Sequence, residues 1–231
     1  EPDFQAFHPA FRMLFNSYYN GIGEKHPRAQ RGLLTRPGLD QVLAYRQNVD
    51  ARILSLWQQG SSEKLASLLE LGLQHEQQHQ ELMLTDVLHL FSCNPLQPQL
   101  FATPLPEAHW VTPFTWMPYE AALLEIGHRG KDFCFVNELP RHRQFVEAFE
   151  MATRLVSNGE YLAFIEAGGY QNAALWLSEG WDWVKNQQLR HPLYWQLHGP
   201  QWHEFVLHAL HDLDLHKPVC HLSLFEAAAY A

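Results

Sequence analysis

The sequence predicts an α+β protein of two domains, a helical bundle followed by a mixed α and β domain. One observation is a pair of long, proline-free stretches with apolar residues at helical spacing, which end near residues 60 and 94. Another is a change of character after Pro95, where short apolar runs alternate with glycine, proline and asparagine. We expect a bundle over residues 1–95, a linker over 96–120 and a second domain over 121–231.

Three helices are expected in the first domain. Aromatic and apolar residues at helical spacing predict a buried helix over residues 7–19. A second helix over 38–60 opens after a Pro-Gly pair and stops at a glycine. The third runs over 61–94, with Ser61 or Ser62 as its N-terminal cap. Helices of this length with shorter connections predict an antiparallel bundle, for which four helices are the usual number.

The second domain is expected to combine strands with short helices. Short apolar runs at residues 122–128, 133–135 and 143–149 read as strands. Ser157 and the glutamate three residues later predict a capped helix that continues to Ile165. The tryptophan-rich stretch that follows has little regular periodicity, so we expect it to be rich in loops.

Composition narrows the possible function. The 231 residues carry a formal net charge of −9, which argues against a nucleic-acid or anionic-membrane binder. No run approaches the roughly 20 apolar residues of a membrane span, no signal peptide is visible, and three scattered cysteines form no disulfide framework, so the expected location is the cytoplasm. The chain begins at Glu1 and stops within a helical pattern at Ala231, so we expect a piece of a longer protein.

The third helix carries the chemistry. His75 and His79 are four residues apart, so they lie about 40° apart on one helical face. The same face carries Leu68, Leu71 and Leu82, and it is therefore expected to point into the bundle. Two neutral imidazoles at this spacing can share one metal ion, and Asp86 near that face could orient them or a water molecule. A pair of hydrogen-bonded core histidines is the alternative.

The pair also satisfies the H-E-x-x-H pattern of zinc proteases, with Glu76 as the general base. One class of these proteases would continue with glycine and histidine where this chain has Leu82 and Thr85. A protease is therefore the weaker interpretation.

A loop over residues 24–37 holds the densest positive charge, with Lys25, Arg28, Arg31 and Arg36. It is either a solvated basic loop or a clamp for anions, because guanidinium groups pair bidentately with carboxylates.

Several stretches together resemble the sulfoxide synthases of ergothioneine biosynthesis, in which a DinB-like helical bundle precedes a formylglycine-generating-enzyme-like domain. The resemblance covers nearly the whole chain and is carried by residues 14–19, 31–37, 75–86, 137–142, 156–165, 168–170, 176–181 and 218–221. It implies that the second domain is of this type and incomplete at its C-terminus. Cys134 and Cys220 do not recreate the catalytic cysteine pair of formylglycine-generating enzymes, so that chemistry is not expected.

The resemblance implies a site with Fe(II) held by His75, His79 and a third histidine, which we expect upstream of Glu1. Arg28 and Arg31 would clamp the carboxylates of a thiol substrate, and Gln78 would hydrogen-bond the acceptor imidazole. The catalytic tyrosine of the family is expected beyond Ala231.

The implied reaction uses Fe(II) and O2 to join a thiol, cysteine or γ-glutamylcysteine, to the imidazole of Nα-trimethylhistidine as a sulfoxide. The expected partners are thus small molecules, with neither nucleic acid nor membrane. Two alternatives remain: an ovothiol-type or selenoneine-type synthase with the same iron site, and a DinB-like zinc thiol transferase or binding module. The sequence leaves the thiol and the oligomeric state open.

Overall fold

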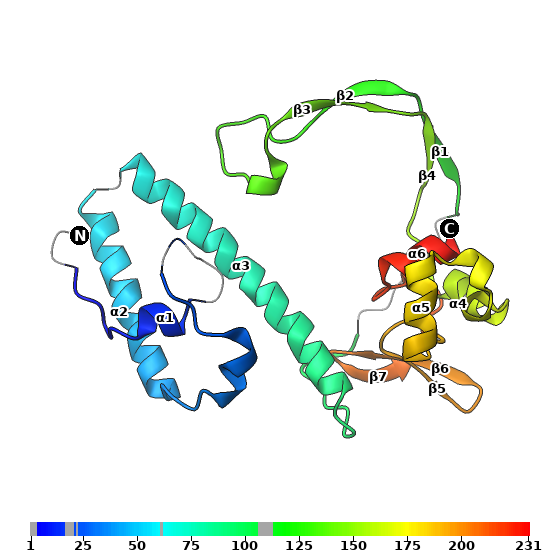
Figure 1. The fold of residues 1–231 in the computed structure, drawn as a ribbon, viewed down its shortest axis with the longest axis horizontal. Coiled ribbons are helices and arrows are strands. Elements are labelled where there is room, and N and C mark those ends of the chain that lie inside the picture. The colour runs from blue at the N-terminus through cyan, green and yellow to red at the C-terminus, as the bar shows by residue number, and fades with distance from the viewer. Residues whose placement is uncertain (1–3, 17–20, 22, 61, 106–112) are drawn as a thin grey trace. The chain divides into compact units, whose positions relative to one another are not determined.

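The computed structural model describes residues 4–16, 21, 23–60, 62–105 and 113–231. The chain divides into two compact units, residues 1–73 and 74–231, and helix α3 runs across the division. The predicted α+β class is confirmed, because the N-terminal region is helical and the remainder combines strands with short helices (Figure 1). The predicted limits of bundle, linker and second domain remain a prediction.

The two long helices are confirmed. Helix α2 covers Leu39–Gln58, and α3 covers Glu63–Ser92. The backbone N–H of Leu65 donates to the Ser62 hydroxyl over 3.2 Å, as expected of a capping serine. Ser61, the other candidate cap, lies outside the described residues.

The predicted helix over 7–19 is wrong in extent. Within the described residues it is reduced to the four residues of α1, Phe11–Leu14, and residues 17–20 lie outside the description. Pro9 explains the late start, because a proline disfavours the helical backbone of the residue before it. The aromatic rings pack across the first unit instead. The rings of Phe7, Phe11 and Phe15 lie 5.5, 5.1 and 5.7 Å from that of Tyr45 on α2.

The apolar face of the long helices stays largely uncovered. Helix α2 has no buried residue among its described side chains, and α3 buries only Leu88. Leu68, Leu71 and Leu82 are 56%, 48% and 53% exposed. Helical periodicity shows which residues share a face but not what covers it. The expectation that packed helices enclose the histidine face therefore remains a prediction.

In the second unit, two antiparallel strand pairs follow one another as an extended ribbon (Figure 1). Strand β1, Trp116–Tyr119, pairs with β4, Phe149–Ala152. Strand β2, Ala122–Ile126, pairs with β3, His142–Val146. The predicted strand over 143–149 is thus two strands, because the chain changes partner between Val146 and Phe149.

The predicted strand over 133–135 is wrong. These residues are unpaired and lead into the 3-10 helix η3, Val136–Glu138. The Glu138 carboxylate accepts from the backbone N–H of Phe135 over 2.7 Å, and this local bond turns the chain where a strand would continue.

The rest of the second unit is a helical layer with a three-stranded sheet. The predicted helix at 157–165 is confirmed as α4, Asn158–Glu166, with Ser157 as its cap. Helix α5, Ser178–Gln187, and strand β5, Trp195–His198, lie in the tryptophan-rich stretch where loops were expected. Strands β6, Gln201–Val206, and β7, Ala209–Asp212, were not predicted. Helix α6, Leu224–Tyr230, lies in the helical pattern expected near Ala231. The strands pair in the order β5-β6-β7, all antiparallel.

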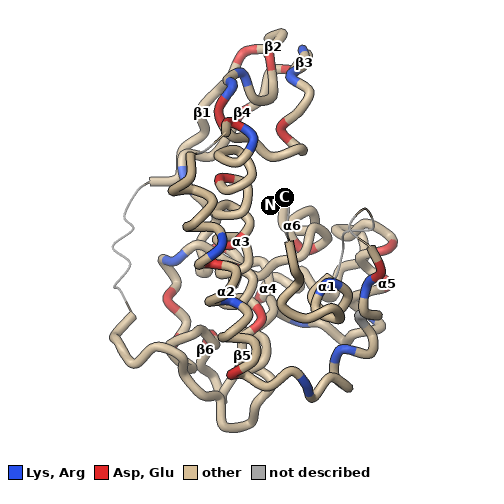
Figure 2. Tube along the Cα trace, turned by 90° about the vertical axis from the view of Figure 1, so that its left-hand side faces the viewer, with Lys and Arg blue, Asp and Glu red and all other residues tan. Residues whose placement is uncertain are grey.

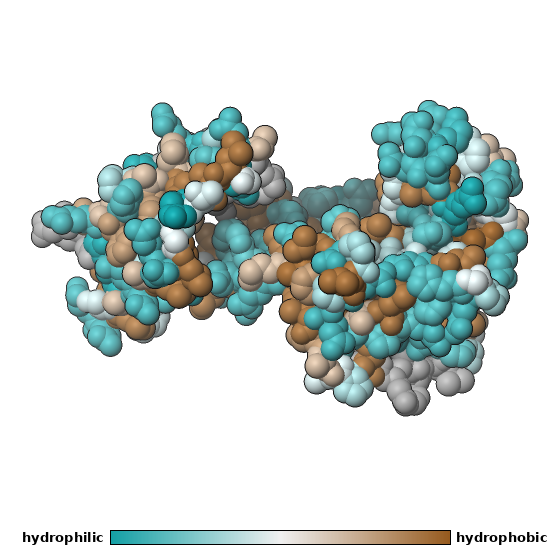
Figure 3. All heavy atoms as spheres, turned by 90° about the horizontal axis from the view of Figure 1, so that it is seen from below, coloured by the Kyte–Doolittle hydropathy of each residue, from teal (hydrophilic) through white to brown (hydrophobic). Residues whose placement is uncertain are grey.

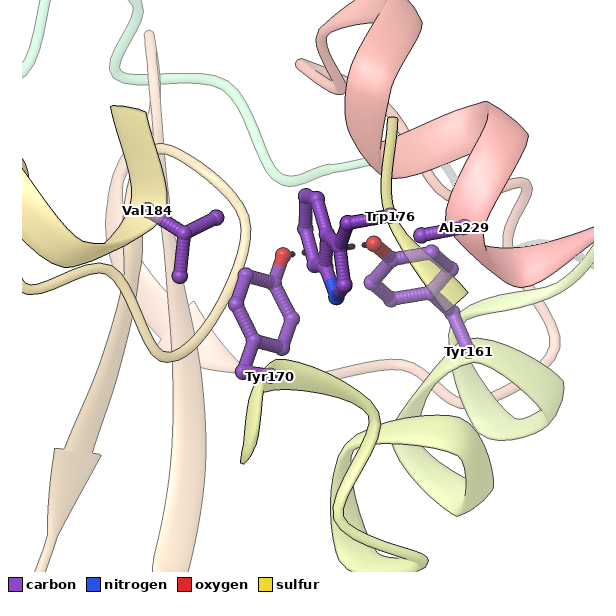
Figure 4. Packing of buried hydrophobic residues seen from close by; sticks show 5 residues of the cluster. All are labelled: Tyr161, Tyr170, Trp176, Val184 and Ala229. Carbon is purple, nitrogen blue, oxygen red and sulfur yellow. Dashed lines mark hydrogen bonds between the residues drawn. The ribbon is translucent and has the colours of Figure 1, made fainter. Parts of the chain in front are cut away.

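The core of this unit joins α4, α5 and α6. Its buried residues are Tyr161, Tyr170, Trp176, Val184 and Ala229 (Figure 4). Glycine permits the closest approach: a Cβ built at Gly180 on α5 would lie 2.7 Å from the Phe225 side chain on α6.

The surface has mixed character. Figure 2 shows basic and acidic residues interspersed along the trace, without a long run of one sign. Figure 3 shows apolar residues reaching the surface at several places. Among the described residues, the helices fall short of the combined length and apolarity needed to span a membrane.

Candidate metal centre

The regular backbone of α3 brings the two predicted ligands together. The Nε2 atoms of His75 and His79 are 3.3 Å apart, and their ring centroids are 4.5 Å apart with the planes inclined at 69°. The rings therefore face each other across one helical turn. His75 is half-buried and His79 is exposed.

This spacing can be tested against a shared ion. Two nitrogens that each lie about 2.1 Å from one ion are about 3.0 Å apart at a right angle and about 3.4 Å apart at the tetrahedral angle. The observed 3.3 Å lies between these values. The same distance also suits a hydrogen bond in which one ring N–H donates to the other ring nitrogen. The imidazole pair fits a metal ion, and it is equally consistent with a metal-free pair of rings.

Over the residues that the structure describes, no group of three or more His, Cys, Asp or Glu side chains is placed to hold a metal ion. Two imidazoles alone bind an ion weakly, because structural and catalytic sites normally use three or four protein ligands. The third histidine upstream of Glu1 thus remains a prediction.

Gln78 and Asp86 lie on the same helix, and both are exposed. Helix α3 continues without a break past Leu82 and Thr85, where the Thr85 hydroxyl donates to the Glu81 carbonyl over 3.1 Å. The roles predicted for Gln78 toward a substrate and for Asp86 toward an ion remain predictions.

The basic loop is found in the first unit. Its centre forms the 3-10 helix η2, Arg28–Leu33, in which Arg31 is exposed, while the side chain of Arg28 lies outside the described structure. The Arg36 guanidinium donates to the neighbouring Thr35 carbonyl over 2.6 Å. The clamp formed by Arg28 and Arg31 remains a prediction, since the histidine pair belongs to the other unit.

A buried polar network was missed from the sequence. The hydroxyls of Tyr161 and Tyr170 are 3.2 Å apart, and Tyr170 donates to the Glu226 carboxylate over 2.5 Å. The other carboxylate oxygen of Glu226 accepts from the Ser223 N–H over 2.7 Å. Burial raises the pKa of both tyrosines, and for Tyr170 the bond to Glu226 raises it further. Both phenols therefore stay protonated. The only local signal was the capping pattern at Ser223 and Glu226.

A second carboxylate is held by an ion pair at the edge of the same layer. The two guanidinium nitrogens of Arg154 donate to the two oxygens of Glu160 over 2.8 and 2.7 Å. This bidentate pairing, with a further bond from the Ser157 N–H, lowers the pKa of Glu160 to about 2.

The second unit can be compared with known domain families. Residues 120–231 match the sulfatase-modifying factor enzyme 1-like domain family. This match agrees with the second domain that the resemblance implied.

The chain is also similar over most of its length to a particular group of proteins. It is 28% identical over 227 residues to a hercynine oxygenase of Mycobacterium tuberculosis. This alignment covers 96% of this chain and 50% of the relative. It is 27% identical over 223 residues to a hercynine oxygenase of Mycolicibacterium thermoresistibile, with 96% and 48% covered. A third, from Mycolicibacterium smegmatis, is 26% identical over 207 residues, with 90% and 47% covered. The chain spans about half the length of these relatives, and the resemblance predicted from the sequence is confirmed.

Proposed function

We propose that this chain provides part of a non-haem Fe(II)-dependent oxygenase that acts on hercynine, the Nα-trimethylated form of histidine, in ergothioneine biosynthesis. The observation that carries the proposal is the facing pair of His75 and His79 imidazoles, in a chain whose relatives are hercynine oxygenases. A cytoplasmic location accompanies the proposal.

The imidazoles are proposed to hold the iron through their Nε2 atoms, together with a third histidine. Three neutral ligands would leave about three positions of an octahedral ion open and leave the site positively charged toward anionic donors. Iron would supply the one-electron chemistry that activates O2.

The remaining predicted residues would bind and orient the substrates. Arg28 and Arg31 would pair with the carboxylates of cysteine or γ-glutamylcysteine, because guanidinium groups pair bidentately with carboxylates. Gln78, adjacent to His79 in the sequence, would donate a hydrogen bond to the hercynine imidazole, directly or through water. These contacts would place the thiol sulfur beside the ring carbon that it attacks.

The proposed reaction balances without an external reductant. A thiol, an imidazole C–H and O2 give a sulfoxide and one water. Formation of the C–S bond and oxidation of sulfur each remove two electrons, and together they supply the four electrons that reduce O2.

The test is oxygen uptake by the full-length protein after anaerobic loading with Fe(II). Uptake that requires both hercynine and a thiol, with a sulfoxide product of the expected mass, would support the proposal. Uptake with histidine in place of hercynine would favour an ovothiol-type synthase. Fe(II) loading without substrate-dependent oxygen uptake would refute the oxygenase.

A second candidate is a zinc thiol transferase or binding module. Two Nε2 atoms 3.3 Å apart also suit two corners of a tetrahedral site, the geometry typical of zinc. Tight Zn(II) binding together with thiol transfer, and no oxygen uptake in the Fe(II)-loaded protein, would establish this alternative.

A further inference from the structure

The C-terminal end of α3 contacts Tyr194, the residue directly before strand β5 of the three-stranded sheet. The Tyr194 hydroxyl lies 3.4 Å from Nδ1 of His89, one helical turn before the end of α3, and the two rings are 6.1 Å apart. The Tyr194 ring also meets the ring of His221 edge to face, with centroids 4.7 Å apart and planes inclined at 76°. Tyr194 is thus held between the helix and a loop that lies 27 positions further along the chain.

The backbone at both contact residues is unusual. Tyr194 has φ of 72° and His221 has φ of 61°, in the left-handed region that side chains other than glycine rarely adopt. Such strain persists only where the surroundings fix the residue, and it is typical of positions that act as clamps. Here the two residues whose rings meet, Tyr194 and His221, both have such a backbone.

The chain just after α3 is tied to the same sheet. The Gln97 side chain donates to that of Gln196 on β5 over 3.0 Å. The backbone N–H groups of Leu100 and Phe101 donate to the Leu207 carbonyl, beside the end of β6, over 2.8 and 3.1 Å. The segment after the helix is therefore anchored independently, and Tyr194 supplies a contact to the helix itself.

The hydroxyl is suited to this contact. Partial burial, with a further contribution from Cys93, raises the pKa of Tyr194, so the phenol stays protonated and can donate to His89.

We propose that Tyr194, braced by His221, is a positioning residue that docks the C-terminal end of α3 on the β5–β7 sheet. His89 and His79 are ten residues apart on one continuous helix, about 15 Å along its axis. Docking the end of such a rod fixes the direction in which it presents the imidazole pair. The docking stands on its own contacts, and only its consequence for turnover rests on the proposed function.

The experiment is hydrogen exchange of the backbone amides, followed by mass spectrometry on the full chain in its native state. In Tyr194→Ala, exchange at residues 88–92 should be about 10-fold faster than in the unsubstituted protein, while α4 and α5 exchange as before. Tyr194→Phe keeps the ring and loses the hydroxyl, so a smaller acceleration is expected. His221→Gly keeps the left-handed backbone and removes the supporting ring, so it should resemble Tyr194→Ala.

The matched control is Tyr119→Ala on β1, which should leave exchange at residues 88–92 unchanged. Unchanged exchange at 88–92 in Tyr194→Ala would overturn the proposal. An acceleration shared equally with α4 would also overturn it, because that result would mean general destabilisation.

A kinetic measurement separates this inference from the proposed function. Tyr194→Ala should bind Fe(II) within about 3-fold of the unsubstituted affinity and lose about 10-fold in kcat for the substrate-dependent oxygen uptake. If the unsubstituted protein consumes no oxygen, the proposed function fails, while faster exchange at 88–92 would still establish the docking. If oxygen uptake is normal in Tyr194→Ala although exchange at 88–92 is faster, the docking is established and its consequence for turnover is refuted.

Discussion

Helix α3, which carries the histidine pair, differs in side-chain burial from the aromatic cluster around Tyr161. Helix α3 has thirty residues, of which Leu88 alone is buried among those described, and His79 lies at the surface. Tyr161 is fully buried, and Tyr170 and Trp176 beside it are 4% and 7% exposed. The candidate chemistry therefore stands on a helix whose shape depends on backbone hydrogen bonds, whereas the stability of the second unit is concentrated in a small aromatic core.

Because burial differs, polar residues have different roles in the two regions: they specify packing in the cluster and are available for ligand binding on α3. The Tyr161, Tyr170 and Glu226 network is enclosed, with each member bonded to another, so it specifies packing. The Nε2 atoms of His75 and His79 on α3 lie 3.3 Å apart, and His79 is exposed, so this pair is placed to take a ligand. Substitutions in the first region should change the free energy of unfolding, and substitutions in the second should change metal binding.

The largest effect is expected from Tyr161→Ala. Removal of this fully buried ring should lower the free energy of unfolding by about 4 kcal/mol, since both its packing and its hydroxyl contact are lost. Urea denaturation at neutral pH measures the change. The control Tyr119→Ala removes a tyrosine that is 43% exposed, and it should cost much less. Equal losses for the two variants would break the contrast between core and surface.

His79→Ala should have the next largest effect, on metal binding. Affinity for Fe(II), measured by anaerobic calorimetry, should fall by about 100-fold or more because a ligand is lost. The free energy of unfolding without metal should stay within about 0.5 kcal/mol, since the side chain is exposed. His216→Ala, another exposed histidine, serves as the control and should bind Fe(II) normally. An iron-replete His79→Ala protein would refute the site.

Tyr170→Phe should lower the free energy of unfolding by about 2 kcal/mol. The substitution leaves one oxygen of the buried Glu226 carboxylate without the hydroxyl that donates to it. Tyr161→Phe is the matched comparison, because it removes a contact between two neutral hydroxyls, and a loss of only about 1 kcal/mol is expected. If Tyr161→Phe proved the more costly, Glu226 would not be the centre of the network.

The smallest effect concerns pH. Because the pKa of Glu160 is lowered from 4.5 to about 2, its pairing with Arg154 stabilises the fold fully above about pH 4.5 and is lost as pH falls through about 2. Urea midpoints of the unsubstituted protein and of Glu160→Gln should therefore converge over that interval. Glu150→Gln, at an exposed position on β4, should show no such convergence. A constant difference between Glu160→Gln and the unsubstituted protein from pH 6 to pH 2 would contradict the assignment.

Sequence reasoning succeeded where the signal is local. Helices α2, α3 and α4 were expected from periodicity and capping residues, and Ser62 and Ser157 cap as predicted. It failed for β5, β6 and β7, because a strand is stabilised by partners on other segments and its own residues here alternate weakly. The helix expected over 7–19 failed for a related reason, since its aromatic residues pack on Tyr45 of a distant helix.

By itself the sequence determined that His75 and His79 share one helical face, because residues four positions apart lie on the same face of an α-helix. It also determined the capped starts of α3 and α4, where a serine side chain bonds the backbone a few residues away. Only the tertiary structure decided that Tyr170 meets Glu226 and that Tyr194 meets His89. These are contacts between residues far apart in the chain, and their formation depends on how whole elements pack.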